Sequence, residues 1–204
     1  MMSPKAGLIG LIPALTAILF LAVAIGVDKW QYKNEQVSKY VEFQGHGGLW
    51  KFCNDTTRTY SQSIGMNVVK VKETLISVCY DFTDICSQRM AYYLRVVQYA
   101  LFASIAFMFL GILLILVKHC LLKEWKHEKQ QMVLGFISAT FAFLTGILAV
   151  LAFGIFHVEL VLEGYSLHAG FYLTVIAWLL SWVTGSIFLV DSICIGAKMY
   201  PDLK

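Results

Sequence analysis

The stretch Gly48-Leu49-Trp50-Lys51-Phe52-Cys53 decides the fold, because it lies in a long polar segment between one apolar run and three later ones. The 204-residue chain is 58% hydrophobic and 14% charged, with a mean hydropathy of +0.68, which is too apolar for an ordinary water-soluble domain. Each run is about 20 residues long, the length that an α-helix needs to cross about 30 Å of hydrocarbon. We therefore expect a membrane α-helical protein that exposes residues 48–53 on one side of the bilayer.

The four apolar runs predict a four-transmembrane-helix bundle that forms one domain over residues 1–204. Backbone N–H and C=O groups find no water in hydrocarbon, so each run is expected to form a helix. The first run also has the small-residue pattern of a signal-peptide cleavage site at Ala22-Val23-Ala24, but its apolar stretch is longer than the roughly 7–15 residues of such a peptide, which favours a retained helix. The predicted spans are residues 7–27, 96–117, 132–156 and 169–190.

The distribution of lysine predicts the orientation. Residues 118–131 contain Lys118, Lys123, Lys126 and Lys129, whereas residues 157–168 contain no Lys or Arg. Short loops that carry positive charge stay on the cytoplasmic side. Residues 118–131 are therefore the expected cytoplasmic loop, both termini are expected in the cytoplasm, and residues 28–95 and 157–168 are the outer loops.

The first outer loop is expected to form most of a small extracellular antiparallel β-sheet. Residues 40–43, 48–53 and 69–72 have short alternating or aromatic-rich patterns bounded by glycine and asparagine. Residues 87–98 instead favour a helix that runs into the second span. Small residues at Gly135-x3-Ala139, Ala142-x3-Gly146 and Ser181-x3-Gly185 predict close helix contacts, within the chain in preference to a homodimer.

The five cysteines divide between the two sides of the predicted membrane. Cys53, Cys79 and Cys86 fall on the oxidising outer side, where a disulfide is stable. Cys53 with Cys79 is the favoured pair because it would join two candidate strands, and Cys53 with Cys86 is the alternative. Cys120 and Cys194 lie at cytoplasmic ends of spans, where cysteines are candidates for palmitoylation, with an unmodified buried thiol as the alternative.

No chemistry-bearing cluster in the sequence indicates an enzyme. The histidines are scattered over both sides, no pair has metal-site spacing with Cys or a carboxylate, and no nucleophile–base grouping or phosphate-binding glycine loop occurs. No ionisable residue lies at mid-depth in a span, as a transporter would require. Lys and Arg are spread over the loops at a net charge of +3, unlike a nucleic-acid-binding surface. We expect no catalytic residue, metal, cofactor or nucleic-acid partner.

The residues Trp30, Gly48-Leu49-Trp50, Cys53 and a later loop cysteine, together with four spans and a long first outer loop, make the sequence resemble the claudin superfamily. This superfamily comprises the claudins, the peripheral myelin and epithelial membrane proteins, and the gamma subunits of calcium channels with their receptor-regulating relatives. Claudins usually place the second cysteine about ten residues after the first, whereas 25 residues separate Cys53 from Cys79 here. The resemblance therefore leaves the branch open.

The resemblance implies one of two non-enzymatic functions in the plasma membrane. A claudin-like protein would act at cell junctions, by adhesion or as a paracellular barrier, with membrane lipid and with copies of itself or related tetraspan proteins as partners. The alternative is an auxiliary gamma-type subunit that modulates an ion channel or receptor; a myelin-like membrane organiser is a third, weaker interpretation. Asn54-Asp55-Thr56 is an N-glycosylation sequon on the outer side, although Cys53 beside it could hinder modification. Five charges on the first outer loop are candidates for lining a path between cells: Lys70, Lys72, Glu73, Asp81 and Asp84.

Overall fold

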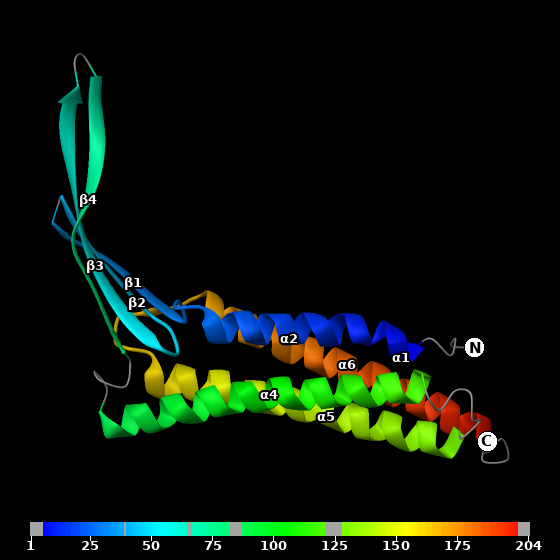
Figure 1. The fold of residues 1–204 in the computed structure, drawn as a ribbon. Coiled ribbons are helices and arrows are strands. Elements are labelled where there is room, and N and C mark those ends of the chain that lie inside the picture. The colour runs from blue at the N-terminus through cyan, green and yellow to red at the C-terminus, as the bar shows by residue number, and fades with distance from the viewer. Residues whose placement is uncertain (1–5, 39, 65–66, 82–86, 121–127, 200–204) are drawn as a thin grey trace.

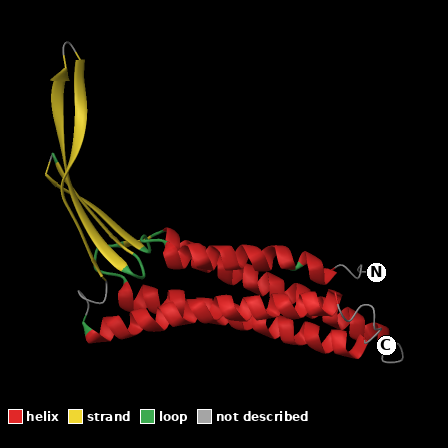
Figure 2. Cartoon of the chain, viewed as in Figure 1, coloured by secondary structure: helices red, strands yellow, loops and turns green. Residues whose placement is uncertain are grey.

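Four apolar helices run side by side and carry a β-sheet at one end of the bundle (Figure 1, Figure 2). The computed structural model describes residues 6–38, 40–64, 67–81, 87–120 and 128–199. Within these residues four helical segments are long and apolar enough to cross a membrane: Gly7–Gly26, Gln88–Cys120, Glu128–Leu160 and Ala169–Lys198. We call the end of the bundle that carries the sheet the sheet end, and the opposite end, where the first helix begins and the last one finishes, the far end (Figure 1).

The helices are longer than most of the predicted spans. The first span consists of α1 (Ala6–Ile9) and α2 (Leu11–Gly26), and the second is α4 (Gln88–Cys120), which includes the expected helix leading into it. The fourth is α6 (Ala169–Met199). The predicted boundaries followed hydropathy, whereas these helices continue into polar residues because intrahelical hydrogen bonds also form outside hydrocarbon.

The prediction that the second outer loop starts at residue 157 is wrong. The third span, α5 (Glu128–Ile155), continues as a π-helical turn, η1 (Phe156–Leu160). This continuation buries Phe156 and Leu160 completely in the core, which a loop starting at residue 157 would not do. The predicted cytoplasmic loop is shorter too, because its first three residues belong to α4 and its last four to α5, while residues 121–127 lie outside the described part of the chain.

Small residues fill the interior of the bundle. α2 packs beside α4 and α6, and α5 packs beside the same two helices, so α4 and α6 are diagonally opposite. The predicted close-approach residues of α5 and α6 are all buried inside the chain: Gly135, Ala139, Ala142, Gly146, Ser181 and Gly185. Apolar side chains gain little by leaving lipid, so close backbone approach is what holds such helices together. The intramolecular use of these faces is confirmed.

The sheet is antiparallel and has the order β4-β3-β2-β1-β5. Its strands are β1 (Gln31–Ser38), β2 (Val41–Gly47), β3 (Lys51–Ile64), β4 (Asn67–Asp81) and β5 (Ser166–Leu167). β1 and β5 were not predicted, because β1 is polar and mostly exposed and β5 has only two residues. The expectation that residues 48–53 form a strand is correct only for residues 51–53, because residues 48–50 form the turn between β2 and β3.

The hairpin of β3 and β4 extends beyond the rest of the sheet. β2 pairs with β3 only from Gly47↔Phe52 to Val41↔Arg58, whereas β4 follows β3 to the pair Ile64↔Asn67. Residues 59–64 and 67–72 therefore form a two-stranded projection, which we call the arm, and Figure 1 shows it pointing away from the helices. A register shift between Thr56 and Thr57, a β-bulge, separates the arm from the base of the hairpin.

Candidate functional site

Both tryptophans of the family-like motif hold the end of the first span. The indole N–H of Trp30 donates to the carbonyl of Ala24 at 2.6 Å, and that of Trp50 donates to the carbonyl of Ile25 at 2.7 Å. These carbonyls belong to the last turn of α2, where a helix has no backbone donors left for them. The motif therefore caps α2 and fixes the sheet to it.

The two tryptophans differ in burial. Trp30 is fully buried, with its ring 4.7 Å from that of Phe156. A Cβ on Gly170 would lie 2.4 Å from the Trp30 ring, so only glycine fits at that position in α6. Trp50 is 42% exposed and lies 6.4 Å from the ring of Phe102 on α4. Trp30 is therefore a core residue, whereas Trp50 covers the junction of α2 and α4 from outside.

The glycine and leucine of the motif complete this junction. A Cβ on Gly48 would lie 2.7 Å from the Cα of Asp28, so the turn can approach the chain leaving α2 only without a side chain. Leu49 is fully buried, and its carbonyl accepts a hydrogen bond of 2.8 Å from the Gln98 amide on α4. Gly48 therefore allows the motif turn to lie directly against the backbone at the end of α2.

Gln31 is a site residue that the sequence analysis missed. Its amide oxygen accepts from the backbone N–H of Leu162 at 2.8 Å, and its amide nitrogen donates to the carbonyl of Leu160 at 3.4 Å. The side chain is fully buried, and Gln31 also pairs with Leu167 of β5. Gln31 thus joins the two predicted outer loops, and the only signal for it in sequence was its position beside Trp30.

The disulfide joins Cys53 to Cys79, the favoured pair. These residues are direct partners in the β3–β4 register, so the bond links the two strands at the base of the hairpin. Ser77 continues the cross-strand contacts by donating to the Asp55 carboxylate at 2.7 Å. Cys86, the alternative partner, lies outside the described residues.

The candidate loop charges do not gather at one place. Lys70, Lys72, Glu73 and Asp81 are exposed on β4, and Asp84 lies outside the described residues. Lys70 and Lys72 are two residues apart and share a face, whereas Glu73 points to the opposite face. Lys72 is also paired, because its ammonium lies 2.8 Å from the Glu42 carboxylate.

Glu42 is the most strongly perturbed acid of the sheet. Hydrogen bonds from Lys72, Gln44 and Asn34 lower the pKa of its carboxyl from 4.5 to about 2. The carboxylate is therefore ionised at neutral pH and links β2 to β4 across the intervening strand. Glu42 and Asn34 border a polar hollow of about 390 Å³ between β1, β2 and β3, which is lined by Asn34, Gln36, Tyr40, Val41, Glu42 and Thr59.

The candidate modification sites lie in different environments. Asn54 is half-buried on β3 between β2 and β4, and its side-chain oxygen has no hydrogen-bond partner among the described residues. Cys120 is exposed at the last residue of α4, and Cys194 is partly buried on α6, both towards the far end. Glycosylation of Asn54 and palmitoylation of the two cysteines remain predictions.

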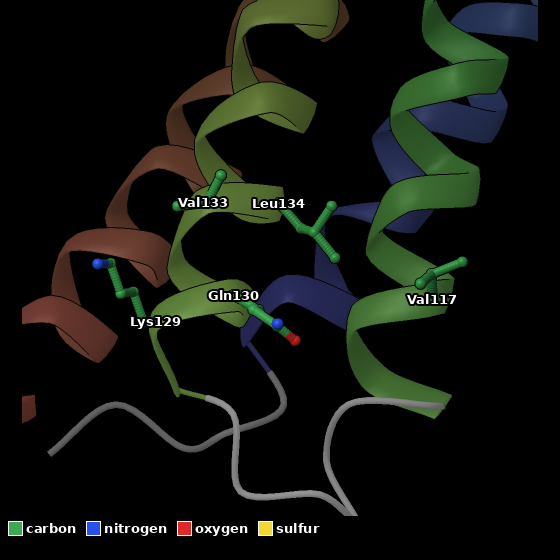
Figure 3. A pocket seen from close by; sticks show the side chains of 5 residues that line it. All are labelled: Val117, Lys129, Gln130, Val133 and Leu134. Atoms are coloured by element: carbon green, nitrogen blue, oxygen red, sulfur yellow. The ribbon is translucent and has the colours of Figure 1, made fainter.

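A second hollow opens at the far end, between α4 and α5 (Figure 3). It has a volume of about 570 Å³ and is lined by Val117, Lys129, Gln130, Val133 and Leu134. In Figure 3 the side chains of Gln130 and Leu134 point from α5 towards α4, while Lys129 points towards the other side of α5. Its wall is mostly apolar, so its surface suits hydrocarbon better than water.

The part of the chain that the structure describes contains no group of three or more His, Cys, Asp or Glu residues arranged to hold a metal ion. The described site is a disulfide-linked sheet with exposed charged and apolar side chains, attached to the end of the first helix through Trp30 and Trp50. Comparison with protein-family models and with curated protein sequences found no match.

Proposed function

We propose that this chain is a claudin-like, non-enzymatic membrane protein that acts at cell–cell contacts through its outer sheet. The observation that carries the proposal is the arm, which extends the disulfide-linked hairpin beyond β1 and β2. Beyond Arg58 the described part of β3 has no register partner in β2, so the arm projects from the sheet where another chain can reach it. In this proposal the helices cross the plasma membrane, the sheet faces outwards, and both termini lie in the cytoplasm.

The composition of the hairpin supports contact with another protein. Exposed apolar side chains lie near its base at Leu75, Ile76 and Tyr80, next to the exposed charges of β4. Large apolar side chains rimmed by polar ones are typical of protein-binding surfaces. β4 is also an edge strand, but its lysines and the bulge at Leu75 disfavour continuous strand pairing along that edge. We therefore propose recognition through side chains on a copy of this chain or a related tetraspan protein.

The second candidate function is an auxiliary gamma-type subunit of an ion channel or receptor. The exposed aromatic residues Trp50, Tyr92, Tyr99 and Phe102 at the sheet end would give such a partner a surface on α4 and the motif turn. The small-residue faces of α5 and α6 do not support it, because they are buried within the chain. A subunit would therefore have to use larger lipid-facing side chains, which makes this the weaker candidate.

Expression alone in non-adherent cells tests the proposal. A contact protein should make these cells aggregate, or should assemble into linear intramembrane polymers where two cells touch. The matched control is a shortened chain in which an Asn-Gly turn joins Thr59 to Lys72, since these residues are register partners and Asn-Gly suits a two-residue hairpin. We expect the control to reach the cell surface without causing aggregation. Absence of both aggregation and such polymers with the full chain at the surface would refute contact formation.

A further inference from the structure

Lys118 and Asp191 form an ion pair inside the bundle. The lysine nitrogen lies 2.5 Å from a carboxylate oxygen of Asp191, and the two side chains are 3% and 8% exposed. Each residue directly follows the predicted end of a span, so Lys118 falls in the predicted cytoplasmic loop and Asp191 falls outside the predicted spans. Charges within apolar helices are costly unless they are paired, so this pair requires an explanation.

All four helical segments meet at this pair. Lys118 comes from α4 and Asp191 from α6, which lie diagonally opposite each other. The ion pair therefore crosses the bundle axis near the far end. A Cβ on Gly7, in α1, would lie 2.9 Å from the Asp191 carboxylate, and a Cβ on Gly135, in α5, would lie 3.0 Å from the Lys118 nitrogen. Two glycines therefore leave the space that the charges occupy.

Other polar groups close this cluster on both sides. The His119 ring lies beside Gly7, with its Cε1 2.7 Å from the position of a Cβ there, and the Ser192 hydroxyl lies 2.0 Å from the position of a Cβ on Gly135. The His119 nitrogen contacts the Ile115 carbonyl at 3.1 Å, and Ser192 donates to the Phe188 carbonyl at 2.8 Å. His119 and Ser192 each have a partner within their own helix, and they lie beside the Lys118–Asp191 ion pair.

We infer that Lys118 and Asp191 are an electrostatic latch that closes the far end of the bundle and specifies which helices lie opposite each other. Small residues allow close approach between neighbouring helices but carry no information about the diagonal. A single buried pair does, because any other arrangement leaves a charge alone in a site of low polarity. The latch also satisfies the lysine within the chain, so no acidic residue of a partner helix is needed. This inference is independent of the proposed function at the sheet.

Double-mutant analysis of the purified full-length protein in nanodiscs tests the latch. The variants are K118M, D191L and the double variant, with K198M as the control, since Lys198 is exposed near the end of α6. Each single variant leaves one unpaired charge and should lower the thermal midpoint by about 10 °C. The double variant should recover most of this loss, and K198M should shift the midpoint by less than about 2 °C.

Hydrogen exchange locates the effect. In the single variants the amides of the last turns of α4 and α6 should exchange faster, while the sheet-end amides keep their native rates. If a single variant fails to fold and the double variant folds, the coupling is supported in the same way. The inference is overturned if the losses of the two single variants add in the double variant, if the double variant also fails to fold, or if the single variants behave like K198M.

Discussion

Replacing Trp30 with phenylalanine keeps an aromatic ring in the core but removes the hydrogen bond to the end of α2. The Ala24 carbonyl would then be buried without a donor, which costs about 1–3 kcal/mol. The smaller ring also leaves unfilled space against Phe156 and Gly170, which adds about 1 kcal/mol. The expected loss for W30F is therefore about 2–4 kcal/mol.

Trp50 provides the matched comparison, because its hydrogen bond to the next carbonyl of α2 has nearly the same length. Trp50 is 42% exposed and its hydrogen bond is only partly buried, so W50F leaves a less enclosed carbonyl and should cost only about 0.5–1.5 kcal/mol.

Thermal unfolding in detergent, followed by size-exclusion chromatography with fluorescence detection, measures both variants. At about 2–4 °C per kcal/mol for a chain of this length, W30F should lower the midpoint by about 5–15 °C and W50F by less than about 6 °C. Equal shifts for the two variants would refute the reasoning that burial of the capped carbonyl determines its contribution.

Three further predictions concern the sheet and its junction. Replacing both Cys53 and Cys79 with serine should destabilise the hairpin by about 3.5 kcal/mol, because the disulfide closes a loop of 26 residues. Amides of β3 and β4 should then exchange faster, while amides of the helices keep their native exchange rates. Faster exchange in the helices would contradict this prediction. G48A should cost about 1–3 kcal/mol in thermal stability, because the new Cβ would meet the backbone of Asp28. G26A, with open space around the new Cβ, should change stability by less than about 0.5 kcal/mol. Similar losses for the two variants would be inconsistent with a close approach of the motif turn to Asp28. The pKa of the Glu42 carboxyl is about 2 in the folded sheet against an ordinary 4.5, so its stabilising contacts are lost as it becomes protonated below about pH 4.5. Protease resistance of the sheet should therefore hold from pH 8 to 5 and fall from about pH 4.5 towards 2. E42Q should lack this fall in resistance.

The membrane spans and the disulfide could be predicted because each has a strong signal in a short stretch of sequence. Apolar runs of about 20 residues predict spans, and the disulfide followed from two candidate strands of one outer loop. The helix ends were less predictable, since α6 and η1 continue where hydropathy falls. Hydrogen bonding and burial of Phe156 and Leu160 decide those ends, and neither is visible in a hydropathy pattern.

The remaining features depend on contacts between distant parts of the chain. Gln31 is buried only because the chain after η1 returns to it 131 residues later, and β5 is too short to have a strand pattern of its own. Lys118 and Asp191 are 73 residues apart and each looks like an ordinary charge at the end of a span. Such pairs become apparent only when the diagonal arrangement of the helices is known.

The most direct test of the proposed contact function is crosslinking mass spectrometry on the protein purified gently from its own membrane. We predict crosslinks between copies of this chain or to related junctional proteins, with several of them on the exposed lysines of β4, Lys70 and Lys72. Stoichiometric recovery of an ion channel or receptor, crosslinked to this chain in place of another copy, would contradict contact formation and favour the auxiliary-subunit function.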